Sequence, residues 1–181
     1  MSMMWGLKAI GFWDEAMGVN VLDSGAPFYD TYETSDGRFV AVGAIEPQFY
    51  ALLLERLGID PAALGPQLDA ARWPEAKRRF AEAFKAKSRD AWAEIFSDSD
   101  ACVTPVLSPW EAHHHPHSAT RNAFLEVAGL MQPAPAPRFS RSRPDDPHPM
   151  DAGGRRVTST LVYWVLAPAE LNTVRAPRAQ H

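Results

Sequence analysis

Residues 25–50, GAPFYDTYETSDGRFVAVGAIEPQFY, decide the fold of this chain. Within this stretch, Tyr29 to Thr34 alternates aromatic with small polar side chains, which is typical of a strand with one buried face. Ser35-Asp36-Gly37 favours a turn, and Phe39 to Gly43 is a short apolar run of strand length. The stretch therefore predicts a β-hairpin, from which the rest of the fold can be worked out.

A carboxylate, Glu46, follows the hairpin directly. Pro47 suits the first position of a helix, so Glu46 is expected at the helix N-terminus. There a negative charge is stabilised by the positive end of the helix dipole. From the residues alone two roles stay open for Glu46: a capping carboxylate, or an acid held rigidly beside a pocket.

Helical spacing of apolar residues and N-terminal Pro or Ser signals predict several helices along the chain. They are Ser2 to about Glu15, with Gly18 near its end; Pro47–Leu57, closed by Gly58; Pro74–Lys87; a helix after Ser88 that carries Trp92, Ile95 and Phe96; and a short helix from Ser108-Pro109. Pro61 to Leu68 is predicted as a turn-rich link between the second and third of these.

Two more strands are expected after the helices. Cys102 to Leu107 reads as a buried strand, and Pro105 places it at a sheet edge or a bulge. Phe124 to Gly129 is a weaker candidate. Residues 132–149 are rich in proline, arginine and aspartate, so they are expected to be extended.

These elements predict an α+β fold, a small antiparallel sheet flanked by helices, followed by an extended Pro-rich C-terminal segment. The expected domains are residues 1–24, a linking helix and connector; residues 25–131, a small α+β domain; and residues 132–181, a Pro/Arg-rich segment and tail.

Composition excludes several function classes. The net charge of −4 and the pI near 5.8 argue against a nucleic-acid or anionic-membrane surface. No run approaches membrane-spanning length, and the N-terminus lacks the basic leader of a signal peptide. The single cysteine, Cys102, excludes a disulfide framework and is expected to be a buried, inert thiol. We therefore expect a cytoplasmic protein.

Two clusters invite other readings. His113-His114-His115-Pro116-His117 resembles a metal-binding tract, but neighbouring histidines point in different directions and no second ligand cluster accompanies them. We therefore predict no metal site. The cations of Arg72 and of Lys77 to Arg79 could bind a phosphate, yet the charge pattern favours a solvated helix face.

Longer motifs carry a resemblance to a known family. Residues 1–13 (MSMMWGLKAIGFW), 25–50, 99–107 (SDACVTPVL) and 135–142 (PAPRFSRS) resemble the C-terminal half of the α-methylacyl-CoA racemases. These belong to the CaiB/BaiF type of the family III CoA-transferase superfamily. The resemblance implies that Glu46 is catalytic or supports catalysis, together with a histidine and an aspartate of the N-terminal half. Those two residues lie outside this chain, which we expect to be truncated and to lack most of the CoA-binding domain.

The resemblance also implies a substrate and a partner. The substrate is a 2-methylacyl-CoA thioester of fatty-acid metabolism, with coenzyme A as part of the substrate and no separate cofactor. An apolar path for the acyl chain is implied for Met3, Met4, Met17, Leu22, Tyr29 and Ile45, and methionine suits it because the thioether repacks around different chains. The partner is the N-terminal domain or a second copy in a homodimer whose active site lies between subunits.

Three functions remain open at this stage. The chain is a racemase portion that is inactive without its N-terminal domain, a portion of another family III CoA-transferase, or a non-catalytic remnant that serves as an interaction module. The GAIEPQFY motif favours the racemase. In the tail, Leu161 to Trp164 and Ala167 to Leu171 resemble the closing helices of family members, with Val165 in place of the turn glycine.

Overall fold

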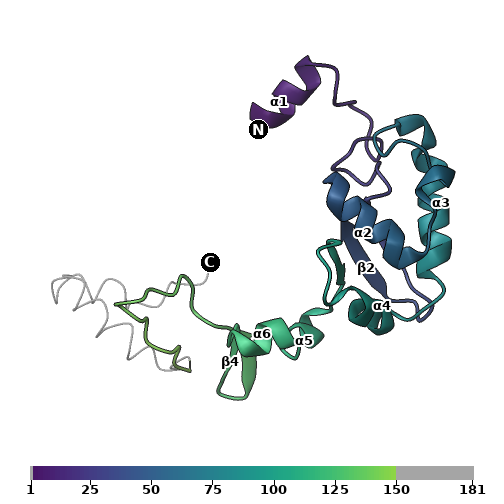
Figure 1. The fold of residues 1–181 in the computed structure, drawn as a ribbon. Helices are drawn as coiled ribbons and strands as arrows, with labels where there is room; N and C mark the ends of the chain where they lie inside the picture. The colour runs from purple at the N-terminus through teal and green to yellow at the C-terminus, as the bar shows by residue number, and fades with distance from the viewer. Residues whose placement is uncertain (1, 150–181) are drawn as a thin grey trace, which may run out of the picture. The chain divides into compact units, whose positions relative to one another are not determined.

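The computed structural model describes residues 2–149 of the chain (Figure 1). Two units are separated between Ser108 and Pro109. The predicted domain boundaries after residues 24 and 131 stay predictions, and the predicted tail helices lie outside the described residues.

The first unit contains a three-stranded sheet and four α-helices. Their bounds are α1 Ser2–Ala9, β1 Tyr29–Glu33, β2 Phe39–Gly43, α2 Pro47–Leu57, α3 Trp73–Phe84, α4 Arg89–Phe96 and β3 Val103–Pro105. Short 3-10 turns at Pro61–Ala63 and Ala70–Arg72 lie in the predicted link and just before α3. Among residues 2–149, no helix is long and apolar enough to cross a membrane.

The sheet is antiparallel with the order β1-β2-β3. Tyr29 pairs with Gly43 at one end of the predicted hairpin, and Glu33 pairs with Phe39 at the other. Strand β3 pairs only with β2 among the described strands, so the edge position predicted from Pro105 is confirmed. The predicted α+β class, a small antiparallel sheet with helices, is also confirmed.

The helices α2, α3 and α4 pack on one face of this sheet. Tyr32, Val40 and Val103 point into the core and are buried, whereas the intervening Thr31 and Thr104 are exposed. This alternation follows from the two-residue period of a strand. Within residues 2–108 the other face of the sheet is therefore open.

A row of aromatic rings joins the helices to the sheet. Phe84 is fully buried and stacks on Tyr32, with ring centroids 5.1 Å apart, and meets the edge of Trp92 at 5.4 Å. Tyr32 also contacts Phe80, and the row continues through Tyr50 to Phe28 and Trp73. The indole N–H of Trp92 donates to the Phe84 carbonyl oxygen at 2.8 Å, which satisfies the polar group inside the core.

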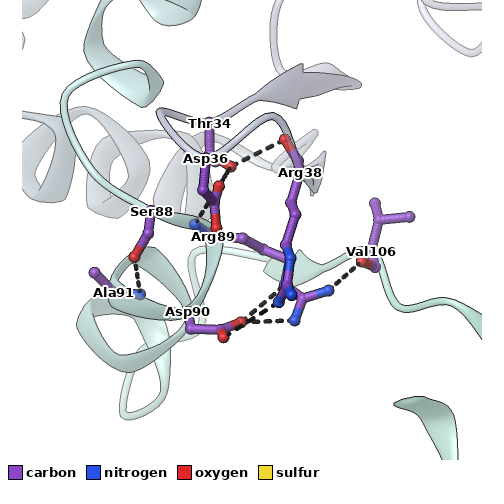
Figure 2. Close-up of polar contacts among 8 residues, drawn as sticks. All are labelled: Thr34, Asp36, Arg38, Ser88, Arg89, Asp90, Ala91 and Val106. Carbon is purple, nitrogen blue, oxygen red and sulfur yellow. Dashed lines mark hydrogen bonds and ion pairs between the residues drawn. The ribbon is translucent and has the colours of Figure 1, made fainter. Parts of the chain in front are cut away.

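A buried arginine fixes the turn end of the hairpin (Figure 2). The Arg89 side chain is 5% exposed and donates to the Asp90 carboxylate at 2.8 Å and to the Val106 carbonyl at 3.1 Å. The Arg89 backbone N–H donates to the Asp36 carboxylate, which also accepts the Thr34 hydroxyl. These contacts tie together the hairpin turn, the start of α4 and the segment that follows β3.

The second unit, described as far as residue 149, begins with two short helices and a hairpin. Their bounds are α5 Pro109–Ala112, α6 Pro116–Thr120, β4 Phe124–Val127 and β5 Leu130–Pro133. The predicted strand at Phe124 to Gly129 is thus the first half of a hairpin. Its turn residues Ala128 and Gly129 both have positive φ angles, 52° and 80°, which match the right-handed twist of paired strands.

Two predictions are wrong. The first helix ends at Ala9 and not near Glu15, because Gly11 takes a left-handed conformation with φ of 74° and turns the chain. Cys102 was expected to be buried, but it is exposed. It precedes β3 and has a φ of 53°, so the inward position belongs to Val103.

Removal of the central ring should unfold the protein more easily. Phe84→Ala should lower the free energy of unfolding by about 3–5 kcal/mol, because a fully buried ring is replaced by a cavity. Urea unfolding followed by tryptophan fluorescence measures this. Phe39→Ala is the matched control, since Phe39 is 45% exposed, and it should change stability by about 0.5 kcal/mol or less. Equal losses in the two variants would contradict the proposed core.

Asp36 should make stability depend on pH. The hydrogen bond from Thr34, followed by those from backbone N–H groups, holds the pKa of Asp36 below its ordinary value of 3.8. A carboxyl whose pKa is lower in the folded state adds stability above the unfolded pKa, and this is lost as the pH falls through the folded pKa. Asp36→Asn should therefore flatten the loss of stability below about pH 4.

Urea unfolding from about pH 6 to about pH 3 tests this dependence. The control is Asp98→Asn, whose exposed carboxylate meets Arg56 at 3.3 Å on the surface. If the free energy of unfolding falls with pH below about pH 4 equally steeply in Asp36→Asn and in the wild type, the role of Asp36 is contradicted.

Candidate functional site

Glu46 lies between the end of β2 and the start of α2, as the sequence of the chain predicts. It is the N-cap residue of α2, with φ of −70° and ψ of 141°, and Pro47 occupies the first turn. A residue before proline is restricted to such extended conformations by the proline ring. The backbone of Glu46 is therefore restricted on its C-terminal side.

The Glu46 carboxylate does not cap the helix. Among the contacts of residues 2–149 it accepts no capping hydrogen bond, and Glu46 is exposed. Its backbone carbonyl instead accepts the N–H groups of Phe49 and Tyr50, each at 3.0 Å. Of the two roles that the sequence left open, this geometry favours an acid that is available to another group.

A shallow hollow of about 410 Å³ lies at the same end of the sheet. It is lined mainly by small side chains and backbone from the three strands and the connector: Ser24, Tyr29, Asp30, Thr31, Ala41, Val42, Gly43, Cys102 and Thr104. Tyr29, the first residue of β1, is 37% exposed and pairs with Gly43. Gly43 precedes Glu46 by three residues. The structure thus brings Tyr29 and the Glu46 segment together beside one hollow.

Cys102 borders this hollow, and the charge of Glu46 affects the pKa of its thiol. Its carbonyl accepts the Gly43 N–H at 2.9 Å, which brings the start of β3 against the end of β2. Although Cys102 as a whole is exposed, the protein atoms around its sulfur displace some water and raise the pKa of the thiol above its ordinary value, and the negative charges of Glu46 and Asp100 raise it further. The thiol therefore stays protonated at neutral pH and is a poor nucleophile.

Lys77 of α3 holds two of the residues that line the hollow. Its ammonium group pairs with the Asp30 carboxylate at 2.6 Å and donates to the Ser24 carbonyl oxygen. Helical spacing placed Lys77 beside Phe80 and Phe84 but gave no sign of these partners, which lie 47 and 53 residues earlier in the chain. The contact joins the connector, β1 and α3.

The other predicted site residues lie on two further elements. Met3 is exposed and Met4 half-buried on α1, while Met17 is 93% exposed in the connector. Leu22 is 38% exposed in the connector, and Ile45 packs half-buried against the core next to Glu46. Only Tyr29 and Ile45 lie on the hairpin end that holds Glu46, so an acyl path formed by all six residues stays a prediction.

The connector is nevertheless well ordered around a buried asparagine. Asn20 bonds to the backbone of Asp14 and Ala16 and to the Asp23 carboxylate, and its carbonyl accepts the N–H of Gly25. Burial alone would raise the pKa of Asp23, but hydrogen bonds from Asn20 and from backbone N–H groups lower it below its ordinary value. A Cβ on Gly25 would lie 2.3 Å from the Val19 carbonyl carbon, so only glycine fits there.

The basic and histidine clusters form no ligand site of their own. Arg78 and Arg79 pair with Glu75, which agrees with a solvated helix face. His113 and His114 have ring centroids 3.7 Å apart at the end of α5. Within residues 2–149 no three His, Cys, Asp or Glu side chains are grouped to hold a metal ion.

Residues 2–151 match the family model of CoA-transferase family III. The chain belongs to this family. It is 50% identical over 142 residues to a mouse protein and 46% identical over 137 residues to a human protein, both named alpha-methylacyl-CoA racemase. These matches cover 78% and 75% of the chain but only 37% and 36% of the relatives. The chain therefore spans little more than a third of the length of these family III relatives.

Solved structures agree on the fold. The crystal structure of the hypothetical protein Rv3272 from Mycobacterium tuberculosis matches with a TM-score of 0.58 at 16% identity. The match covers 73% of this chain and 39% of that one. At this identity the likeness speaks for the fold alone, and the predicted fold is confirmed; the predicted family is confirmed by the family model and the two relatives.

Cys102 can report whether Glu46 stands beside the hollow. Because the Glu46 charge raises the pKa of the thiol, Glu46→Gln should shift the pH profile of Cys102 alkylation by iodoacetamide to lower pH. The chain has one cysteine, so mass spectrometry reads the rate directly. Glu55→Gln, at an exposed glutamate of the same helix, is the control and should leave the profile unchanged. A profile that Glu46→Gln does not move would contradict this placement.

Proposed function

We propose that this chain is the small-domain portion of a cytoplasmic α-methylacyl-CoA racemase, to which it contributes Glu46. The proposed reaction inverts the C2 centre of a 2-methylacyl-CoA thioester. On this proposal the chain is inactive by itself and works with the N-terminal CoA-binding domain, either in one longer chain or in a complex.

One observation carries the proposal. Glu46 stands at the start of α2 in the GAIEPQFY motif, three residues after Gly43 of the hollow, and its carboxylate is exposed and not engaged as a helix cap. The names of the mouse and human relatives supply the reaction that such a carboxylate could serve. The acidic pI and the absence of a spanning helix among residues 2–149 are compatible with this function.

The chemistry requires two groups on opposite faces of one carbon. A base removes the proton from C2, next to the thioester carbonyl, and leaves an enolate; an acid on the other face then returns a proton to C2. Both groups need pKa values near the working pH, and the enolate oxygen needs a hydrogen-bond donor. The described residues place the Asp30 carboxylate in the lining of the hollow, where it is paired with Lys77, and Glu46 just after the strand end that borders the hollow. Glu46 alone cannot serve both faces.

Glu46 therefore supports a partner group in the proposed site. A carboxylate that accepts the N–H of a histidine fixes the ring orientation and raises the pKa of the imidazole. The resemblance places such a histidine, and an aspartate, in the N-terminal half. The rigid start of α2 would hold Glu46 for this contact, since Pro47 limits its backbone.

We propose six residues for contact with the acyl chain of the substrate: Tyr29, Ile45, Leu22, Met3, Met4 and Met17. Tyr29 and Ile45 adjoin Glu46, so they would contact the thioester end of the acyl group. The exposed thioethers of Met3 and Met17 would contact the more distant carbons, where flexible side chains accommodate branched chains. Coenzyme A enters only as part of the substrate.

The N-terminal domain is the partner we propose for the exposed apolar side chains of α1 and the connector. Trp5 is 69% exposed, Ile10 76% and Phe12 53%. Such a concentration of large apolar groups is typical of a surface covered by another domain or subunit. The partner would be the domain of the same chain or that of a second copy in a homodimer.

Deuterium exchange at C2 tests the proposal. This chain alone should not exchange the α-proton of a 2-methylacyl-CoA with D₂O, whereas the chain co-expressed with the N-terminal domain of the mouse relative should. In that mixture Glu46→Gln should lower turnover by about 100-fold, at the lower end of what acid–base groups contribute, with a small change in KM.

Glu55→Gln is again the matched control and should retain full turnover. Exchange by the chain alone would overturn the need for a partner. Exchange in the mixture that Glu46→Gln leaves unchanged would overturn the role of Glu46. A folded mixture without exchange would favour the non-catalytic interaction module.

A further inference from the structure

The side chain of Gln67 reaches back to the two peptide groups that precede Glu46. Its amide nitrogen Nε2 donates to the Ile45 carbonyl oxygen at 2.8 Å and lies 3.3 Å from that of Ala44. Gln67 lies in the turn-rich link between α2 and α3, more than 20 residues after these carbonyls. It therefore joins the segment before Glu46 to a distant part of the fold.

Gln67 is itself held in place by the core. The Trp73 indole N–H donates to the Gln67 backbone carbonyl at 2.9 Å, and Trp73 is 8% exposed. The Trp73 ring packs edge-on against Phe28, with centroids 6.1 Å apart. The Phe28 carbonyl in turn accepts the Ala44 N–H at 2.9 Å. These contacts form a closed circuit: it starts at the segment before Glu46, passes through Gln67, Trp73 and Phe28, and returns to Ala44 in that segment.

This circuit of contacts matters for the orientation of Glu46, because no capping hydrogen bond orients the Glu46 side chain. Pro47 restricts the backbone on the C-terminal side of Glu46. On the N-terminal side, the Gln67 amide fixes the peptide planes of Ala44 and Ile45. Without these bonds the Ala44–Ile45 peptide would keep only the Ile45 N–H bond to Gly43, and the Ile45–Glu46 peptide would lose its bond to Gln67, so the Cα–Cβ direction of Glu46 could turn with it.

We infer that Gln67 is a positioning residue that sets the direction in which the Glu46 side chain leaves the backbone. The inference rests on the proposed function for its effect on turnover, but not for its effect on the backbone at Glu46. Gln67 acts through Glu46 and has no role in binding the acyl chain. A displacement of a reacting group by about 1 Å can lower a rate by about 100-fold, so loss of the clamp should be visible in turnover.

Two variants remove the clamp in different ways. Gln67→Met keeps the length of the side chain but removes the donor, whereas Gln67→Asn keeps the amide but is one methylene too short to reach both carbonyls. Gln48→Met is the matched control, because Gln48 is an exposed glutamine in the first turn of α2.

The first measurement is amide hydrogen exchange by NMR on the full chain, which needs no activity. In both Gln67 variants the amides of Ile45, Phe49 and Tyr50 should exchange at least several-fold faster, since their bonds to Gly43 and Glu46 carbonyls lie in the clamped segment. The Thr34 amide, bonded to Arg38 at the far end of the hairpin, should be unchanged. Unchanged exchange at all four amides, or an equal rise at Thr34 in both variants, would overturn the inference.

The second measurement is C2 deuterium exchange in the reconstituted mixture. Gln67→Met should lower kcat by about 10-fold or more, with KM within about 2-fold of the wild-type value. The double variant with Gln67→Met and Glu46→Gln should have the same kcat as Glu46→Gln alone. A loss that multiplies with that of Glu46→Gln, or that appears in KM alone, would overturn the inference. If the wild-type mixture shows no exchange, the proposed function fails, and the amide measurement still decides whether Gln67 clamps Glu46.

Discussion

The rest of the structure depends on one row of aromatic rings that runs through the core. Phe84 stacks on Tyr32 of the sheet at 5.1 Å and meets Trp92 of α4 at 5.4 Å, so one side chain joins three elements. Large flat rings bury more area than aliphatic groups and have few rotamers, so they fix both the separation and the tilt of the helices. Because α2, α3 and α4 all pack through this row, they lie on one face of the sheet.

That arrangement leaves the other face and the hairpin end for function. Strand β2, the central strand, ends at Gly43, and the chain must turn there, at the end of the sheet, to bring α2 back onto the aromatic row. Glu46 occupies this turn, so the packing that places α2 also places Glu46. Arg89 does the equivalent task at the opposite end, where it bonds Asp90 and Val106 and holds the hairpin turn against α4. The hairpin is thus fixed at both ends, which a positioned carboxylate requires.

Local signals were enough to predict the hairpin, the helix after Pro47 and the N-terminal place of Glu46, because turn and capping chemistry act over a few residues. The predictions of a first helix to about Glu15 and of a buried Cys102 failed because the backbone takes a positive φ at Gly11 and at Cys102, which the spacing of apolar residues does not show. The Lys77–Asp30 pair and the reach of Gln67 to Ile45 span 47 and 22 residues. Sequence spacing carries no information about such contacts until the helices are packed.

The start of α2 differs from three other element starts in the first unit, although α3 likewise has no side-chain cap at Arg72. Asp60, Asp69 and Ser88 each accept a backbone N–H with the side chain, in the usual manner of an N-cap. A cap of this kind stabilises by about 1 kcal/mol, and at α2 this stabilisation is absent although an acid stands in the N-cap position. Natural proteins depart from the locally best choice mainly where function requires it. A longer carboxylate that is not used as a cap leaves Glu46 available for the contact proposed above with a group outside the described residues.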